Sequence, residues 1–270
     1  MLRNLARLGR YRGLIQSLVA RELKARYRGS ILGFFWSFFN PLLLLLVYSI
    51  VFKYVMQAAH DPKVEPYALF MFCGILPWTW FASSLTESSG VLISGGNLIK
   101  KVLFPAEILP IVTVLSNMVH FFFGLVILAG FLIWYQRPLN LSELAVFPLA
   151  VAIQLILTTA LALLLSSLTV HFRDIRDILS NLLTFWFFAT PIIYPYFMFT
   201  DADGKIAWQG QLLKLNPFTH LAITYQEILF FNGPVGHLKL LLLLGAISVV
   251  FFFCCYWVFD RLRDTFAEEV

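Results

Sequence analysis

The side chains best able to do chemistry in this sequence are basic ones near its N-terminus. Within residues 11–30, polar and basic side chains recur at intervals of four, three and four, which places them on one face of a helix. They are Ser17, Arg21, Lys24 and Arg28. This pattern predicts an amphipathic helix in a membrane interface, with basic residues toward anionic lipid. Glu22 and Arg26, four apart, are expected to pair on its apolar side. A plain basic tail that only orients the chain is the alternative.

A second basic segment, 97–104, combines a Lys-Lys pair with apolar residues. Asn97 fits a helix N-cap, and the serine and glycine clusters at 88–90 and 94–96 predict flexible chain before it. A short helix of this kind docks on a partner or lies on lipid, and the residues alone favour neither.

Motifs for enzymatic chemistry are missing from the sequence. It contains no phosphate-binding loop, no His-Glu-x-x-His and no Gly-x-Ser-x-Gly. Cys73, Cys254 and Cys255 lie in apolar runs without paired spacing, so we expect neither a metal site nor a disulfide framework. His120 is the one clear ionisable residue within an apolar run, and a neutral histidine bonded to a neighbouring helix is favoured over a functional one. We therefore expect no enzyme and no cofactor on this chain, with its energy supplied by another subunit.

The amino-acid composition indicates that these residues are positioned by membrane-spanning helices. The chain is 60% hydrophobic and 13% charged, whereas soluble proteins carry about 25% charged residues. Uncharged stretches long enough to cross a bilayer predict an all-α membrane protein with six transmembrane helices in a single domain, 1–270. The expected spans are about 31–55, 66–86, 108–135, 144–170, 178–193 and 238–259.

Charge distribution predicts the orientation of these spans. Placing the N-terminus inside puts most Lys and Arg residues on the cytoplasmic side, as the positive-inside rule requires. Both termini are then cytoplasmic, no cleaved signal peptide is expected, and the bacterial inner membrane is the expected location. The net charge of +5 thus reflects topology, and no nucleic-acid partner is expected.

The segment 194–237 is long for a passive loop. Pro191 and Pro195 are expected to end the fifth span near Ile193. The apolar patches that follow are each too short to span and are broken by glycine and proline. Short re-entrant helices on the outer side fit this pattern, and an ordinary folded loop is the alternative.

Aromatic residues are abundant, with 28 Phe, 10 Tyr and 7 Trp. Their rings suit the apolar faces of sugars, although for any single one of them packed or lipid-facing bulk is the favoured explanation. The candidates for lining a channel are Phe34, Phe35, Trp36, Phe38, Trp186, Phe187 and Tyr194.

Several short motifs in a fixed order resemble one protein family. They are Arg26-Tyr27-Arg28-Gly29-Ser30 with Asn40-Pro41, Gly74-Ile75-Leu76-Pro77-Trp78, Asn97-Leu98-Ile99-Lys100-Lys101 with Phe104-Pro105, Arg173-Asp174-Ile175-Arg176, Pro191-Ile192-Ile193-Tyr194-Pro195 and Asn216-Pro217-Phe218-Thr219-His220. Their order and spacing resemble the membrane subunit of type 2 ABC exporters, in the branch that exports O-antigen, teichoic acid and capsule.

This resemblance implies a homodimer bound to two copies of a separate ATPase that carries ATP and magnesium. Residues 11–30 would be a gate helix, with Arg21, Lys24 and Arg28 meeting the pyrophosphate of a polyisoprenyl-linked O-antigen glycan. Residues 194–237 would form an external gate. The coupling helix to the ATPase would comprise Asn97, Leu98, Ile99, Lys100, Lys101 and Phe104. The external gate would include Pro195, Asn216, Pro217 and His220.

Other functions fit the same residues. Within the class, the cargo is alternatively teichoic acid, capsule or a lipophilic drug. From another class, the chain is a lipid flippase or a membrane-embedded glycosyl-transfer protein that needs no motor. Copurification of a nucleotide-binding chain separates these alternatives.

Overall fold

A computed structural model describes residues 11–26, 28–30, 35–51, 62–101, 104–137, 140–199, 206–231 and 235–269. The elements in these ranges confirm the all-α prediction. The helices are α2 (Arg12–Arg26), α3 (Trp36–Ile50), α4 (Tyr67–Ser94), α5 (Gly96–Lys101), α6 (Ile108–Trp134), α7 (Leu141–Leu144), α8 (Phe147–His171), α9 (Ile175–Phe188), α10 (Trp208–Leu213), α11 (Pro217–Leu229), α12 (Leu238–Leu262) and α13 (Phe266–Glu269). Short 3₁₀ turns are η4 (Pro62–Val64), η5 (Tyr196–Phe199) and η6 (Arg263–Thr265).

Four helical stretches within the described ranges are long and apolar enough to cross a membrane: α4, α6, α7 with α8, and α12 with η6. These match four of the six expected spans. The other two expected spans contain shorter helices, since α3 has 15 residues and α9 has 14. Residues 31–34 and 52–55 of the first expected span lie outside the described part of the chain.

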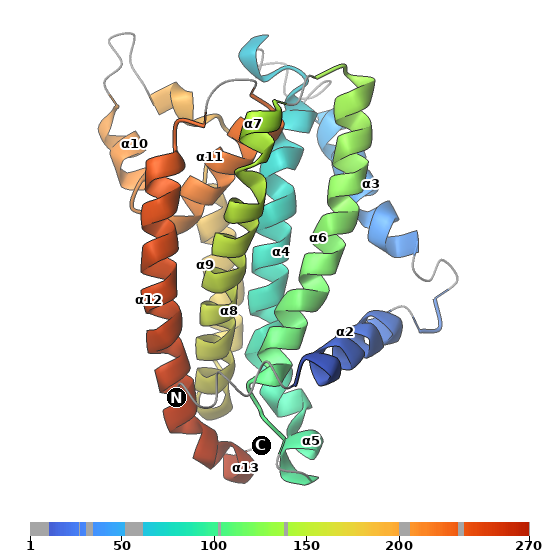
Figure 1. Cartoon of the computed structure of the whole chain (residues 1–270), viewed down its shortest axis with the longest axis vertical. Helices are drawn as coiled ribbons and strands as arrows, with labels where there is room; N and C mark the ends of the chain where they lie inside the picture. Colours follow the sequence, from blue (N-terminus) through green and yellow to red (C-terminus); the bar gives the residue numbers. More distant parts are fainter. Residues whose placement is uncertain are drawn as a thin grey trace.

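α4 lies at the centre of the bundle and packs against α6, α8, α9, α3 and α11 (Figure 1). α12 packs on α8, and α2 lies at a steep angle to the bundle, against α6. α5 and α13 are at one end of the bundle, while α7, α10 and α11 are toward the other.

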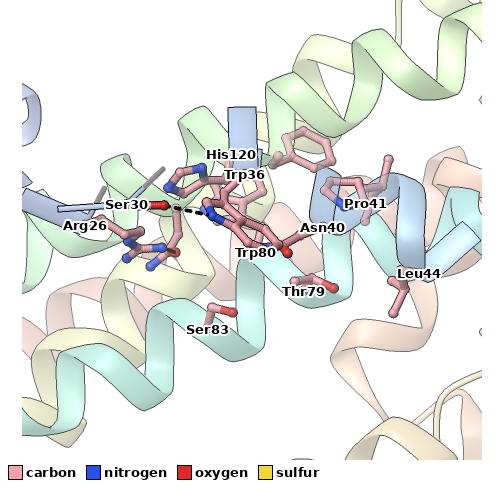
Figure 2. Close-up of a pocket in the computed structure, with 13 residues that line it drawn as sticks. Arg26, Ser30, Trp36, Asn40, Pro41, Leu44, Thr79, Trp80, Ser83 and His120 are labelled. Atoms are coloured by element: carbon pink, nitrogen blue, oxygen red, sulfur yellow. Dashed lines mark hydrogen bonds between the residues drawn. The ribbon is translucent and has the colours of Figure 1, made fainter. Parts of the chain in front are cut away.

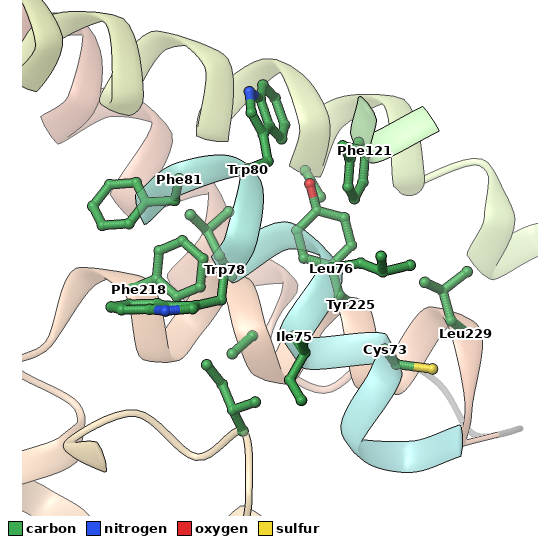
Figure 3. Packing of buried hydrophobic residues seen from close by; sticks show 14 of the residues in the cluster. Cys73, Ile75, Leu76, Trp78, Trp80, Phe81, Phe121, Phe218, Tyr225 and Leu229 are labelled. Carbon is green, nitrogen blue, oxygen red and sulfur yellow. The ribbon is translucent and has the colours of Figure 1, made fainter. Parts of the chain in front are cut away.

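The core around α4 is rich in aromatic rings (Figure 3). Trp78 and Phe81 on α4 pack against Phe218 of α11, with ring centroids 5.0 and 4.8 Å apart. On the other side of α4, Trp80 stacks on Phe121 of α6 at 5.1 Å. Aromatic pairs contribute about 0.5–1.5 kcal/mol beyond their burial, so these contacts hold α11 and α6 firmly on α4.

Two expected boundaries are wrong. α4 continues to Ser94 through the serine and glycine residues at 88–90 that were expected to be flexible, and at 28 residues it is about 42 Å long. Ser88 and Ser89 are buried, so these small residues allow close packing. α9 ends at Phe188 instead of near Ile193. Proline disfavours helical conformation in the residue before it, and the chain turns before Pro191.

Candidate functional site: two adjoining cavities

The first cavity has a volume of about 550 Å³ and lies between the end of α2, α3, α4 and α6 (Figure 2). Its wall combines aromatic rings with amide, hydroxyl, guanidinium and imidazole groups. The lining side chains include Arg26, Ser30, Trp36, Asn40, Thr79, Trp80, Ser83, Asn117, His120 and Phe121. The indole N–H of Trp36 donates to Ser30 Oγ at 2.9 Å, and that of Trp80 donates to the Val114 carbonyl at 3.1 Å. Both rings are therefore fixed in the wall.

The second cavity, of about 480 Å³, lies between α3, α4 and α9. It shares Leu44, Thr79 and Ser83 with the first cavity, so the two adjoin along α4. Trp78 and Phe187 supply rings to this second wall, and hydroxyl groups come from α4 and α9. The mixture suits sugars, because their C–H faces stack on aromatic rings while their hydroxyl groups hydrogen-bond.

One stripe of α4 remains uncovered in an otherwise mostly buried helix. Thr79, Thr86 and Glu87 are exposed along it, and Ser83 and Gly90 are half-buried. Their successive spacings of four, three, one and three residues keep them on one side of the helix. Polar side chains on a membrane helix are costly against lipid, so this stripe is suited to a water-filled space or to another protein.

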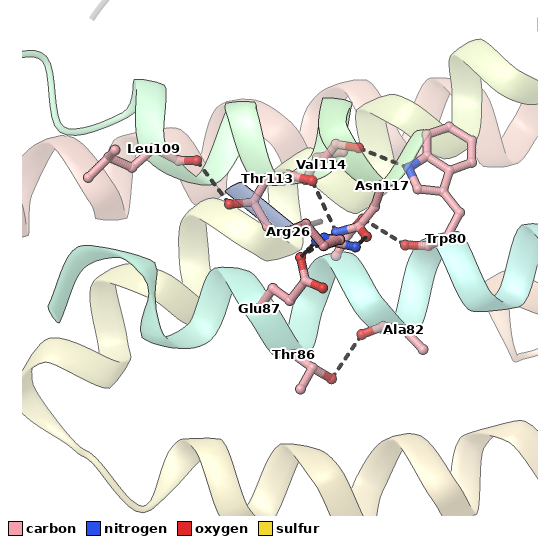
Figure 4. Close-up of polar contacts among 10 residues, drawn as sticks. Arg26, Trp80, Ala82, Thr86, Glu87, Leu109, Thr113, Val114 and Asn117 are labelled. Atoms are coloured by element: carbon pink, nitrogen blue, oxygen red, sulfur yellow. Dashed lines mark hydrogen bonds and ion pairs between the residues drawn. The ribbon is translucent and has the colours of Figure 1, made fainter. Parts of the chain in front are cut away.

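A polar network fixes the end of α2 beside the first cavity (Figure 4). Arg26 Nη2 lies 2.7 Å from Glu87 Oε2, and Arg26 Nη1 donates to Asn117 Oδ1 at 3.2 Å. The Asn117 amide donates to the same Glu87 oxygen at 2.8 Å and to the Thr113 carbonyl at 3.1 Å. Three helices thus meet at one carboxylate. The expected pairing of Arg26 with Glu22 is wrong, because Glu87 approaches from α4 and takes the guanidinium.

Glu22 lies near this network without forming an ion pair with Arg26. Burial raises the pKa of its carboxyl above the ordinary 4.5, and repulsion from Glu87 adds to the rise. Attraction to Arg26 and Arg21 lowers it in part. An ionised Glu22 therefore opposes the docked position of α2.

The basic residues predicted to meet a pyrophosphate lie outside the two cavities. Lys24 and Arg28 are exposed, and Arg21 lines a third cavity of about 260 Å³ between α2 and the α4–α5 junction. Arg26 is the basic residue that lines the first cavity, and sequence reasoning did not select it. Its partner is 61 residues away, so no local spacing could reveal it.

The predicted channel aromatics fall in several environments. Trp36 lines the first cavity and Phe187 the second. Phe35 is exposed, whereas Phe38 packs on Phe123 of α6 at 5.0 Å. Phe34 lies outside the described residues.

Two other predicted channel residues make polar contacts at the end of α9. Trp186 donates its indole N–H to Asn216 Oδ1 at 2.7 Å and packs on Phe81 at 5.3 Å. Tyr194 donates its hydroxyl to the Phe188 carbonyl at 3.0 Å. Both side chains therefore help to shape the junction between α9 and the segment that follows.

The predicted coupling segment contains the six-residue helix α5. The helix begins at Gly96, so Asn97 is inside it and is not its N-cap. Asn97 and Lys100 are exposed, while Leu98 and Phe104 are half-buried against the helix bundle. The side chains of Ile99 and Lys101 lie outside the described part.

The residues predicted for an external gate surround the start of α11. Asn216 caps this helix by accepting from the Phe218 N–H at 2.9 Å, and Pro217 is its first residue. The Asn216 amide also donates to the Ala189 carbonyl at 3.0 Å. The ring nitrogen Nε2 of His220 hydrogen-bonds the Lys214 carbonyl at 2.9 Å. The Asn216 contact therefore joins the end of α9 to α11, and the His220 contact joins α11 to the end of α10. Pro195 is buried.

Metal-binding groups of three or more His, Cys, Asp or Glu residues are absent from the part of the chain that the structure describes. The two cavities contain a guanidinium, a carboxylate and an imidazole, but these groups serve a polar network or a cavity wall. The arrangement is suited to binding and passage.

An uncovered polar stripe on a central membrane helix, with cavities on both sides, is an arrangement for moving a polar solute. Residues 13–230 match the ABC-2 type transporter family, and the chain belongs to this family of multi-pass membrane transporters. It is 40% identical over 271 residues to the O-antigen export system permease protein RfbA of Myxococcus xanthus, covering 100% of both chains. It is 31% identical over 263 residues to the permease protein RfbA of Klebsiella pneumoniae, covering 97% of this chain and 96% of that one.

Proposed function

We propose that this chain is the membrane permease subunit of an ATP-driven exporter that moves a polyisoprenyl-pyrophosphate-linked O-antigen polysaccharide across the bacterial inner membrane. The observation that carries this proposal is the pair of cavities that adjoin at Thr79 and Ser83, whose walls combine aromatic rings with hydroxyl groups. Similarity to O-antigen export permeases over the full chain supports the same cargo.

Six spans and an N-terminus inside the cell complete this proposal. α3 and α9 would supply the first and fifth spans, together with chain outside the described ranges. The short helices α10 and α11 would form the re-entrant outer segment, with Asn216 and His220 in the external gate. Both termini would then be cytoplasmic, as the distribution of Lys and Arg favours.

A second copy of the chain would close the open side of the cavities. The stripe of α4 and the polar face of α9, which includes Ser180 and Thr184, are uncovered in one chain. Pairing two copies across this face would remove the stripe from lipid and enclose a conduit between the subunits. The glycan would enter beside α2, where Arg26 and the exposed Arg21, Lys24 and Arg28 offer positive charge to a pyrophosphate.

The energy would come from a separate ATPase that docks on α5. The exposed Asn97 and Lys100 would face this partner, and half-buried Leu98 and Phe104 would anchor the helix to the bundle. ATP and magnesium would be bound by that partner. Because a ligand shifts an equilibrium only through differential affinity, α5 must bind the partner differently with and without ATP.

Copurification tests the class of machine. The tagged chain, expressed with the ATPase subunit of its export system and purified in mild detergent, should retain that subunit in a one-to-one ratio with ATPase activity. A chain that purifies alone, and that supports surface O-antigen without the ATPase, would refute the proposal and favour a motor-independent flippase.

A blocking substitution tests the conduit. Thr79→Trp fills the shared wall of the two cavities from an exposed position, so it should abolish surface O-antigen while the ATPase still copurifies. Val126→Trp adds the same ring to an exposed apolar site on α6 and should leave export intact. Equal export by the two variants would place the glycan path elsewhere.

A further inference from the structure

The C-terminal segment 263–269 folds back beneath the bundle instead of leaving it. After α12, the turn η6 leads into α13, which lies next to α5 (Figure 1). α13 packs against both α5 and α8. The segment therefore joins the last span of the chain to the helix proposed to receive the ATPase.

One aromatic side chain anchors this segment. Phe266 is fully buried, and its ring packs on Phe259 of α12 at 5.3 Å. The surrounding cluster draws residues from three other parts of the chain, namely Leu92 of α4, Ala106 and Leu109 around the start of α6, and Val170 of α8. Leu98 of α5 packs at the edge of the same cluster.

Two polar contacts fix the segment at both sides of this cluster. Arg263 Nη1 lies 3.6 Å from Glu107 Oε2, and the Glu107 side chain is only 4% exposed. A buried carboxylate without a cation is costly, so the Arg263 guanidinium offsets the charge of Glu107 at the start of α6, although it lies beyond hydrogen-bonding distance of that oxygen. Thr265 Oγ1 lies 3.0 Å from Nε2 of His171, the last residue of α8.

α5 depends on the rest of the bundle for its stability. It has six residues, which is too short for a stable isolated helix, and Gly95 separates it from α4. A displacement of α5 moves the spans only if α5 is packed against residues that are themselves attached to the spans. Close-packed side chains transmit such displacements, whereas a loosely attached helix would move alone.

We infer that the C-terminal segment is a brace that fixes α5 to the ends of α6, α8 and α12, and that Arg263 and Phe266 are positioning residues for transport. The inference rests on the proposed function, in which α5 receives the ATPase. The brace converts movement of α5 into movement of the spans, so its loss separates ATP hydrolysis from export.

The first test measures export per ATP hydrolysed by the complete complex in proteoliposomes or cells. Arg263→Gln should leave the ATPase bound and active but lower export per ATP about fivefold, a typical size for lost coupling. The double variant Glu107→Gln, Arg263→Gln removes the orphaned charge but still lacks the contact, so its export per ATP should stay within about twofold of that of Arg263→Gln. Full recovery in the double variant would assign the loss to the buried charge and overturn the positioning role of Arg263. A merely structural role would lower folded protein and both activities together.

The second test follows α5 directly and needs no ATPase. A nitroxide label at Asn97→Cys, with the exposed Cys254 replaced by alanine, reports the mobility of α5. Phe266→Ala should increase that mobility, whereas Phe253→Ala, an equal truncation on the exposed face of α12, should not.

The outcomes separate the brace from the proposed function. Unchanged label mobility in Phe266→Ala, or unchanged export per ATP in Arg263→Gln, would overturn the brace even with a working exporter. Failure of the unmodified chain to bind any ATPase would overturn the proposed function, and increased mobility of α5 in Phe266→Ala would still support the brace as an anchor of that helix.

Discussion

Removing the guanidinium of Arg26 should release α2 from the bundle. The substitution Arg26→Ala deletes an ion pair of 2.7 Å with Glu87 and a hydrogen bond of 3.2 Å with Asn117. The Arg26 and Glu87 side chains are 31% and 37% exposed, so solvent screening places the ion pair at about 1 kcal/mol. The second hydrogen bond adds about 0.5 kcal/mol. A total of about 1.5 kcal/mol corresponds to a tenfold change in the docking equilibrium.

Hydrogen exchange of the α2 backbone measures this equilibrium. Amide exchange that proceeds through local opening is proportional to the fraction of open helix, so Arg26→Ala should speed exchange in 12–26 about tenfold. Arg26→Lys keeps the positive charge but cannot contact Glu87 and Asn117 at the same time through a guanidinium. It should speed amide exchange in 12–26 about threefold. Lys24→Ala removes an exposed charge from the same helix and is the matched control.

The result that refutes this reasoning is equal exchange in Arg26→Ala and Lys24→Ala. It would mean that apolar packing of Leu18 against Ile108 and Val112 holds α2 without the network. A double variant offers a second check. Glu87→Ala should speed exchange of α2 little further in a chain that already carries Arg26→Ala, because both substitutions remove the same ion pair.

Two other substitutions test the polar contacts of the fold. Because burial and Glu87 raise the pKa of Glu22 above 4.5, docking of α2 should weaken as pH rises from that value through the raised pKa, and Glu22→Gln should remove this dependence. Thermal unfolding of both proteins from pH 4 to 8 should show the variant more stable at high pH and equal at pH 4, and parallel profiles would contradict the sign. Asn216→Ala loses a helix cap and the bonds that join α9 to α11, so it should lower unfolding free energy by about 2–4 kcal/mol. Asn181→Ala, on the exposed face of α9, should have a much smaller effect on the unfolding temperature.

Sequence patterns predicted the elements whose causes are local. The helical fold and four of the spans follow from uncharged stretches, because a bilayer imposes a minimum apolar length on each crossing helix. The basic periodicity over 11–30 likewise gave α2, which occupies Arg12–Arg26. The start of α11 also has a local cause, since Asn216 supplies the cap and Pro217 the first residue, but the sequence analysis did not predict it.

Predicted helix boundaries were wrong where a residue distant in the sequence stabilises a charged side chain within a helix. The second span was expected to stop before Glu87, because a carboxylate ordinarily ends an apolar stretch. α4 instead continues through it, since Arg26 and Asn117 satisfy that carboxylate. The same contact explains the wrong pairing of Glu22. Neither effect is visible in spacing along the chain, because it depends on how α2 and α6 pack on α4.

The location of the proposed conduit follows from which polar groups the fold leaves uncovered. Along the stripe of α4, Glu87 is satisfied by Arg26 and Asn117 from the same chain. Ser83 and Thr79, one and two turns before Glu87 in the helix, face two cavities whose walls do not close around them. Small hydroxyl residues contribute little to the packing of a membrane helix against lipid, and their retention there needs a polar occupant or a second subunit. Within the stripe, Glu87 therefore holds α2 against the bundle, whereas Thr79 and Ser83 remain accessible to a transported solute.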